Sequence, residues 1–229
     1  MFERVDDSGR GQMKSSSAET AAWSEAFAAP ELSRRRQRTY ERKLRRLQLL
    51  IPVTGRTLDI ACGHGDALQL LARRGHRRLV GVDLSPSGVV VPTPFDRLVA
   101  DGGRLPFSDG SFERIMCLHS LHHFRSFAGI GRVLAECRRV LTDDGHLYLL
   151  DHWGSVWLRG LFRVFEWRCS LYPAVARRFG QQLREEHDAI FWWLTEWRRL
   201  YDELRTAGFI IEHQSRTAAF LHLRCRPDE

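Results

Sequence analysis

From residue 57 onward, short apolar runs alternate with stretches of helical periodicity. The strand-like runs cover residues 57–61, 79–82, 97–100, 114–118 and 146–151, and helical periodicity fills 67–74 and 127–141. Near-continuous apolar strands that are separated by helices are typical of a parallel sheet covered on both faces. The pattern therefore predicts an α/β domain.

After residue 151 this alternation stops. A Trp-rich helical segment at 153–190 comes first, then a helix at 193–207 that Gly208 ends, then strand-like runs at 209–215 and 218–224. The last two runs can pair as a hairpin. We predict a Rossmann-like, doubly wound sheet of seven strands, mostly parallel with a C-terminal antiparallel hairpin, and a helical insertion after the fifth strand.

The N-terminal part has a different pattern. We expect residues 1–19 to be a disordered leader and 20–229 a single domain that begins with helices over 20–51. In the second of these helices, Tyr40, Leu44 and Leu47 share one face, and most of the arginines lie elsewhere. Packing of this helix on the sheet edge is slightly favoured over a basic helix that closes a site or touches a membrane.

Composition narrows the setting of the protein. No apolar run reaches the roughly 18 residues of a membrane-spanning helix, and the N-terminus lacks the apolar core of a secretory signal. The cysteines are widely spaced and odd in number, which disfavours disulfides and a zinc site. They are Cys62, Cys117, Cys137, Cys169 and Cys225. We expect a cytoplasmic protein without a metal.

The net charge of +7 admits two interpretations. It can indicate an anionic partner, or only an Arg-rich surface in water. No basic stretch is interleaved with exposed aromatic residues as in nucleic-acid platforms, so the second interpretation is favoured.

The segment 57–75 carries the first chemical motif. A strand leads into a loop with Gly63 and Gly65, and a helix begins near Asp66. Such glycines let a ligand approach the backbone closely. Leu68 stands where dinucleotide-binding loops need a small residue, and Asp59 and Asp66 would repel a pyrophosphate. The loop therefore favours a ligand with an amine or a sulfonium.

Two further carboxylates follow strands. Asp83 ends the second strand, where it can accept both hydroxyl hydrogens of a ribose or, alternatively, cap a helix that starts near Ser85. Asp101 follows the third strand, where it can bind an adenine amine or serve as an ordinary turn residue.

The segments LDIACGHG, GVDLS, DGGRLPFSDGSFERI and ECRRVLTDDGHLYLLD resemble successive motifs of class I S-adenosylmethionine-dependent methyltransferases. The resemblance covers about residues 40–151 and points to the group with ubiquinone- and menaquinone-biosynthesis enzymes. It implies S-adenosyl-L-methionine as the cofactor. The implied contacts are Asp59, Ala61, Gly63 and Gly65 at the methionine moiety, Asp83 at the ribose, Leu84, Asp101 and Gly102 at the adenine, and Cys117 and Leu118 near the methyl group.

This sequence departs from that pattern in places. Ala61 stands where many members have glycine, and Glu113 where aspartate is common. The stretch between Asp83 and Asp101 is short and carries Pro86, Pro92 and Pro94, which implies a truncated second helix.

Histidines follow the fourth strand, at the edge of the sheet where open α/β folds bind ligands. His119 and His123 are candidate catalytic bases, with His122 beside them and His152 after the fifth strand as a comparable candidate. A structural or cofactor-lining role is the alternative, since the resemblance places a histidine at position 123 in members with diverse acceptors. No Asn/Asp-Pro-Pro-Tyr/Phe segment is present, which disfavours methylation of nucleobases and glutamine.

The helical insertion at 153–190 is the segment expected to define the methyl acceptor. It is interpreted as a lid over an apolar acceptor, with a peripheral membrane contact through 153–168 or a plain packing helix as alternatives. The predicted function is methyl transfer to a small hydrophobic acceptor such as a quinone, polyketide or lipid, by O- or C-methylation. An RNA or protein methyltransferase and a non-catalytic cofactor-binding subunit stay open as alternatives.

Overall fold

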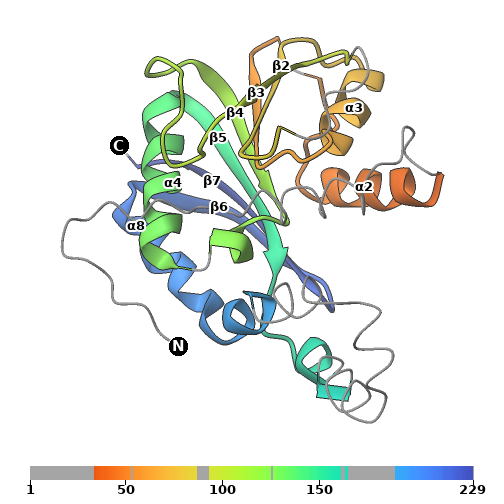
Figure 1. Cartoon of the computed structure of the whole chain (residues 1–229), viewed down its shortest axis with the longest axis vertical. Coiled ribbons are helices and arrows are strands. Elements are labelled where there is room, and N and C mark those ends of the chain that lie inside the picture. The colour runs from red at the N-terminus through yellow and green to blue at the C-terminus, as the bar shows by residue number, and fades with distance from the viewer. Residues whose placement is uncertain are drawn as a thin grey trace.

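A computed structural model describes residues 34–52, 54–86, 93–124, 126–160, 163–164 and 189–228. Within them a seven-stranded sheet has the order β3-β2-β1-β4-β5-β7-β6 (Figure 1). The strands are β1 Thr57–Ile60, β2 Leu79–Asp83, β3 Asp96–Val99, β4 Phe112–Leu118, β5 Leu141–His152, β6 Phe209–Arg216 and β7 Phe220–Pro227.

The strands from β3 to β5 are parallel, and β7 pairs antiparallel with both β5 and β6. The predicted α/β class, the seven strands and the C-terminal hairpin are therefore confirmed. The largest boundary difference is at β5, which begins at Leu141 rather than near residue 146. It does so because the preceding helix runs directly into the strand, and Leu141 is already extended with φ −81° and ψ 139°.

Helices cover both faces of the sheet (Figure 1). Helices α2 Arg34–Arg46 and α3 Asp66–Arg73 lie on one side, and α4 Phe127–Val140 and α8 Leu200–Thr206 on the other. Along β5, Leu147 and Leu149 join the core under α4, while Tyr148 and Leu150 join the core under α2 and α3. This period of two positions places a packed layer on each face.

The packing interpretation of α2 is supported by its buried face. Leu44 and Leu47 are 0% and 1% exposed and share a core cluster with Leu68 and Leu71 of α3. Arg38, Arg42, Arg45 and Arg46 of α2 are exposed, and Arg45 is 71% exposed. The part of the predicted N-terminal helices before residue 34 lies outside the described residues, as does the predicted leader.

The segment after residue 188 closes the α4 side of the sheet. Residues 189–196 are helical and lead into the 3-10 helix η2 Trp197–Arg199 and then α8, so the helix predicted at 193–207 is found with a 3-10 interruption. Gly208 ends it at φ +76°, a conformation that favours glycine. The indole of Trp193 is 0% exposed and donates to the carbonyl of His152 over 2.6 Å. This contact ties the segment to the end of β5.

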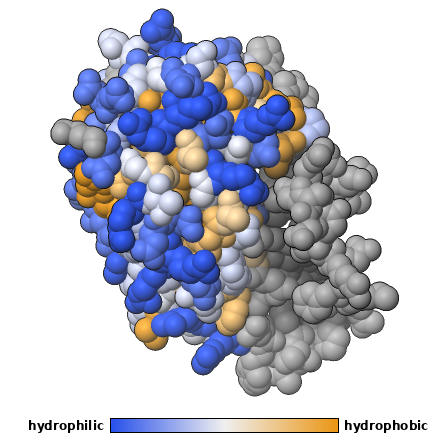
Figure 2. Space-filling view, turned by 90° about the vertical axis from the view of Figure 1, so that its left-hand side faces the viewer, coloured by the Kyte–Doolittle hydropathy of each residue, from blue (hydrophilic) through white to orange (hydrophobic). Residues whose placement is uncertain are grey.

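Most of the predicted insertion at 153–190 lies outside the described residues. Of its described part, residues 156–160 are helical, and Val156 and Trp157 are 78% and 82% exposed. The face in Figure 2 is mostly hydrophilic with scattered apolar residues. Among the described residues, no helix has the length and apolar character needed to cross a membrane. Cys62, Cys117, Cys137 and Cys225 are free, and Cys169 lies outside the described part.

Candidate active site

The loop after β1 is built from left-handed backbone. Gly63 and Gly65 have φ of +52° and +75°, and Ala61 has +55°. A Cβ on Gly63 would have no atom within 4 Å, so this glycine borders open space. A Cβ on Gly65 would lie 2.3 Å from the ring of Phe95. The two glycines therefore serve different purposes. Gly63 leaves space beside the loop, and Gly65 lets the ring of Phe95 pack against the backbone.

Ala61 is strained at the position where the resemblance expects glycine. A left-handed conformation costs a residue with a Cβ roughly 1–2 kcal/mol. Its carbonyl lies 3.5 Å from the hydroxyl of Ser120, which also donates to the carbonyl of Leu118 over 3.0 Å. The loop after β1 is thus joined to the segment after β4.

The carboxylate of Asp83 organises the same loop. Its Oδ2 accepts a hydrogen bond from the amide of Gly63 and its Oδ1 one from the amide of Ser85, both over 2.8 Å. Each carboxylate oxygen has a second lone pair, so these bonds leave acceptor positions for ribose hydroxyls. The predicted ribose-binding role and the predicted capping role of Asp83 are compatible.

Sequence reasoning missed Arg97 of β3. Its Nε donates to the carbonyl of Gly63 over 3.2 Å and its Nη2 to the carbonyl of Ser85 over 2.8 Å. The guanidinium therefore holds the two peptide segments that contact Asp83. Because the chain is rich in arginine, nothing in the sequence distinguishes Arg97 from the other arginines.

The acidic residues of the first motif are buried. Asp59 is 3% exposed and Asp66 9%. Burial, with Asp83 and Asp66 close by, raises the pKa of Asp59 well above its usual value. A cationic group in the loop would favour the charged form of Asp59, in line with the predicted amine or sulfonium.

The residues predicted around the adenine follow β2 and β3. Leu84 is 53% exposed, and Asp101 is exposed and accepts a hydrogen bond from the amide of Gly103 over 2.8 Å. Gly102 is buried, and a Cβ there would lie 2.9 Å from Ile60. The turn role of Asp101 is thus present, and a contact with adenine stays a prediction.

Cys117 and Leu118 lie at the end of β4 but differ in surroundings. Cys117 is 1% exposed within the core under α4, and burial raises the pKa of its thiol well above the usual value. Leu118 is half-buried and packs against the cluster on the α2 side. Leu118 therefore has the more accessible position near the strand end.

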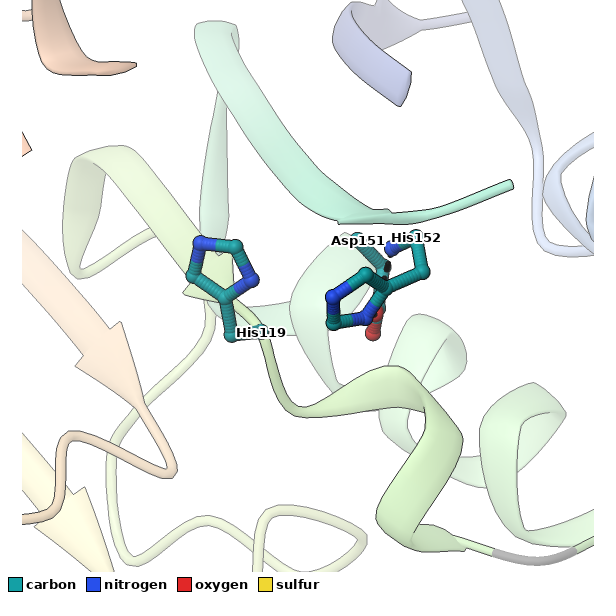
Figure 3. Close-up of side chains that lie close together, drawn as sticks. All are labelled: His119, Asp151 and His152. Carbon is teal, nitrogen blue, oxygen red and sulfur yellow. Dashed lines mark hydrogen bonds and ion pairs between the residues drawn. The ribbon is translucent and has the colours of Figure 1, made fainter. Parts of the chain in front are cut away.

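At the carboxyl ends of β4 and β5, three side chains converge (Figure 3). One ligand atom each of His119, Asp151 and His152 lies within 4.8 Å of the others. Asp151 is 2% exposed and accepts hydrogen bonds from His122 Nδ1 over 2.8 Å and from the amide of His152 over 2.7 Å. Burial alone would raise the pKa of Asp151, but His122 and His152 outweigh it and hold the pKa well below its usual range. Asp151 is therefore a buried anion beside His152.

Of the predicted catalytic residues, only His119 belongs to this group. His123 lies in the 3-10 helix η1 Leu121–Phe124, where its ring centroid is 4.1 Å from that of His122. His122 is 2% exposed and engaged with Asp151. His152, which the sequence offered as a comparable candidate, lies in this group, and a catalytic role of His123 stays a prediction.

Lys43 also belongs to the group around His119, although the sequence alone did not single it out. Its Nζ lies 2.6 Å from His119 Nε2 and 4.6 Å from the centroid of the Phe220 ring. Burial, assisted by Lys43, lowers the pKa of His119 to about 3. Because no sequence pattern links the N-terminal helix to the segment after β4, this contact was not predictable.

The convergence of His119, Asp151 and His152 would also suit a metal ion in spacing. Two imidazoles and a carboxylate are a common ligand set. However, Lys43 occupies Nε2 of His119, and Asp151 Oδ1 already accepts hydrogen bonds from His122 and from the amide of His152. The arrangement is therefore described better as a hydrogen-bonded group than as a metal site.

A separate cleft of about 610 Å³ lies where β5 begins and β7 ends. Its lining carries both charges and includes Arg138, Asp143, Glu212 and Arg226. It is at the far end of β5 from His152 and contains none of the predicted site residues.

Comparison of the sequence with known protein families agrees with this geometry. Residues 58–149 match the family model of a methyltransferase domain. The matched segment holds the loop after β1, Asp83, Asp101 and His119. The predicted resemblance to class I S-adenosylmethionine-dependent methyltransferases is therefore confirmed, and the sheet order agrees with it.

Two relatives show what the chain is similar to. A demethylmenaquinone methyltransferase from Thermotoga maritima is 37% identical over 101 residues, which is 42% of this chain and 43% of that protein. A phthiotriol/phenolphthiotriol dimycocerosates methyltransferase from Mycobacterium ulcerans is 30% identical over 134 residues, 56% of this chain and 46% of that one. The chain therefore matches less than half the length of these relatives.

Solved structures agree in fold. The PH0226 protein of Pyrococcus horikoshii superposes with a TM-score of 0.59 at 18% identity, covering 86% of this chain and 94% of that one. An S-adenosylmethionine-dependent methyltransferase from Mesorhizobium loti gives a TM-score of 0.55 at 17% identity, covering 80% and 97%. At this identity the likeness concerns the fold alone.

Proposed function

We propose that this protein transfers a methyl group from S-adenosylmethionine to a small, hydrophobic acceptor, by O- or C-methylation. The observation that carries the proposal is the arrangement at Asp83. Its carboxylate is held by the amides of Gly63 and Ser85, beside a glycine that borders open space. An adenosyl-sulfonium ligand would place its ribose at Asp83 and its methionine part along the loop after β1.

The acceptor side of the proposal rests on the residues at the carboxyl ends of β4 and β5. His119 and His152 both lie against the ring of Phe220, with centroid distances of 4.9 Å and 5.0 Å. This combination of an apolar wall with imidazoles suits a hydrophobic acceptor whose reacting group needs a proton acceptor. The names of the two relatives, a demethylmenaquinone and a phthiotriol/phenolphthiotriol dimycocerosates methyltransferase, point to acceptors of the same general kind.

Calorimetry with S-adenosylmethionine and S-adenosylhomocysteine tests the cofactor part. Methyl transfer from isotope-labelled S-adenosylmethionine to a panel of phenols, quinols and lipids, with RNA and protein acceptors beside them, tests the acceptor part. We expect cofactor binding and product only with the hydrophobic panel. Transfer to RNA that declines steeply with salt would favour an RNA methyltransferase. Cofactor binding without any product would favour a non-catalytic subunit, and no binding by folded protein would end the proposal.

A further inference from the structure

Lys43 enters the acceptor side of the site from a helix outside the matched domain segment. The neighbouring Leu44 and Leu47 are 0% and 1% exposed and anchor α2 on the core. The ammonium group is therefore held in place by packing, at 2.6 Å from His119 Nε2.

The residue type at this position is itself informative. The chain has 35 lysines and arginines, and only Lys14 and Lys43 are lysine. Arginine stays charged under all ordinary conditions, whereas a buried lysine can change its charge near neutral pH. Burial lowers the pKa of Lys43 to about 8, against the opposing effect of Asp151 and with a further lowering by Arg42.

His119 is held in an unusual conformation. Its φ is +59°, which is uncommon for a residue with a side chain, and its amide donates to the carbonyl of Leu150 over 2.6 Å. The charged and titratable groups that face it are Lys43, Asp151, His152 and His122. Backbone strain of this kind gathers at functional sites.

The rings of His119 and His152 are neighbours at the ends of β4 and β5 (Figure 3). Their centroids are 5.7 Å apart, and Asp151 Oδ1 lies 3.3 Å from His152 Nδ1. One imidazole is thus paired with a cation and the other with an anion. The two imidazoles therefore differ in the hydrogen bonding and proton transfer that they offer to a group bound between them.

We propose that Lys43, His119, His152 and Asp151 form a site that binds and ionises a ring hydroxyl of the acceptor, in a phenol or a hydroquinone. The inference rests on the proposed methyl-transfer function and specifies its acceptor. The hydroxyl oxygen lies between His119 and His152. Lys43 is a positioning residue, because it acts through His119.

The proton inventory of the site supports this assignment. When Lys43 donates to His119 Nε2, the proton of the neutral imidazole is on Nδ1, which can donate to the hydroxyl oxygen. His152 Nε2 takes the hydroxyl proton, and Asp151 stabilises the imidazolium that forms. The O–H electron pair stays on oxygen.

The transfer step then balances without another reactant. The ionised oxygen, or the ring carbon that it activates, forms a bond to the methyl carbon while the methyl–sulfur bond breaks. That electron pair goes to sulfur and leaves S-adenosylhomocysteine. In O-methylation, His152 then returns its proton to water. In C-methylation, the ring carbon loses its proton to water and His152 returns its own proton to the oxygen, which restores the hydroxyl.

The match of acidities favours a phenol over other acceptors. A phenolic hydroxyl has a pKa of about 10, within reach of an imidazole beside a carboxylate. An aliphatic hydroxyl resembles water, at about 15.7, and is far beyond it. An ammonium-bearing acceptor would be repelled by Lys43. The site is thus selective for an oxygen that carries developing negative charge.

The first experiment measures the state of Lys43 directly. In protein labelled with carbon-13 at the lysine Cε, NMR shows only Lys14 and Lys43, so each can be titrated. We expect Lys43 to titrate near 8, below the value of about 10.4 for a free lysine. Adding 4-nitrophenol with S-adenosylhomocysteine should raise the pKa of Lys43, because a bound phenolate favours the ammonium form.

The second experiment uses the colour of 4-nitrophenolate to measure its binding. Lys43→Met should weaken phenolate binding by about 10- to 100-fold, the range for loss of a hydrogen bond to a charged group. Lys43→Arg should restore most of it, since a donating cation is present again. Arg45→Met removes an exposed cation from the same helix and should change nothing. The neutral 4-nitroanisole should bind all variants equally.

Calorimetry with S-adenosylhomocysteine separates the possible failures. If wild-type protein does not bind it, the proposed function fails, whatever the lysine titration shows. If it binds equally well to wild type and Lys43→Met but nitrophenolate binding is also equal, the acceptor site proposed here is wrong. Titration of Lys43 near the free-lysine value of about 10.4 overturns it too, as does Zn²⁺ binding that displaces Lys43 from His119.

Discussion

Asp83 Oδ2 accepts the amide hydrogen of Gly63 over 2.8 Å, which ties the end of β2 to the loop after β1. The strands β1 and β2 are parallel neighbours, so the loop after β1 lies beside the end of β2, and the same carboxylate also accepts from the amide of Ser85. Asp83 is therefore part of the shape of the loop as well as a candidate ribose ligand.

Because Asp83 shapes the loop and is also a candidate ribose ligand, substitutions there should weaken cofactor binding to different degrees. Asp83→Ala should weaken S-adenosylhomocysteine binding by about 1.5–3 kcal/mol, the range for a hydrogen bond to a charged group. Asp83→Asn keeps an acceptor oxygen and should lose less. Calorimetry on both variants measures the difference. Wild-type affinity in Asp83→Ala would remove this residue from the cofactor site.

Alanine substitutions of the two loop glycines should lower the free energy of unfolding by different amounts. Gly65→Ala places a Cβ 2.3 Å from Phe95 in a left-handed backbone, so it should lower the free energy of unfolding by about 2–4 kcal/mol. Gly63→Ala meets no atom within 4 Å and should lose only about 1–2 kcal/mol from backbone strain. Denaturant unfolding measures both. Equal losses would contradict the separate roles.

Gly63→Ala should instead affect the ligand. A methyl group in the open space beside the loop should weaken S-adenosylhomocysteine binding more than the same substitution weakens folding. Calorimetry under conditions where the variant is fully folded tests this, with Ala72→Gly in α3 as the control outside the predicted site.

Ala61→Gly is expected to be neutral or slightly stabilising. It relieves roughly 1–2 kcal/mol of left-handed strain and adds back about 0.4–1 kcal/mol of backbone entropy in the unfolded chain. Ala72→Gly in α3 lacks such relief and should lower the free energy of unfolding by about 1 kcal/mol. A loss at position 61 as large as at position 72 would show that the strain is absent.

Asp151→Asn should destabilise the protein and change its pH dependence. Removing one partner of a buried charged pair costs about 3–5 kcal/mol, and Asp151 is paired with His122. The pKa of Asp151 is lowered by folding, so its stabilisation is complete above its ordinary pKa of 3.8 and is lost as the pH falls further. Unfolding at pH 7 and at pH 3 should therefore show a smaller difference between wild type and variant at pH 3. A constant difference would contradict the anionic state of Asp151.

The centre of the sheet was predictable from the sequence because strands such as β1 and β2 are buried along nearly their whole length and are followed by a glycine loop or end on an acidic residue. The residues of the glycine loop and Asp83 were predictable for the same reason, since adjacent parallel strands end at one edge. The boundaries of the elements were less predictable. Nothing in the sequence at Val140 and Leu141 marks the change from helix to strand.

The acceptor side was only partly predictable. His119 and His152 follow strands and could be expected at the sheet edge, but their pairing with opposite charges depends on distant segments. Lys43 comes from α2, and Phe220 stands opposite His152 because β7 pairs with β5. These contacts arise from tertiary packing, and no local pattern in the sequence encodes them.

The strand order has a consequence for biosynthesis. During translation, β6 leaves the ribosome before β7, yet β7 lies between it and β5. The half of the sheet with the glycine loop and Asp83 can assemble on the nascent chain, whereas β6 must wait for its neighbour. Phe220 arrives with that neighbour, so the ring that stands opposite His152 joins the sheet only after all of its parallel strands have been synthesised.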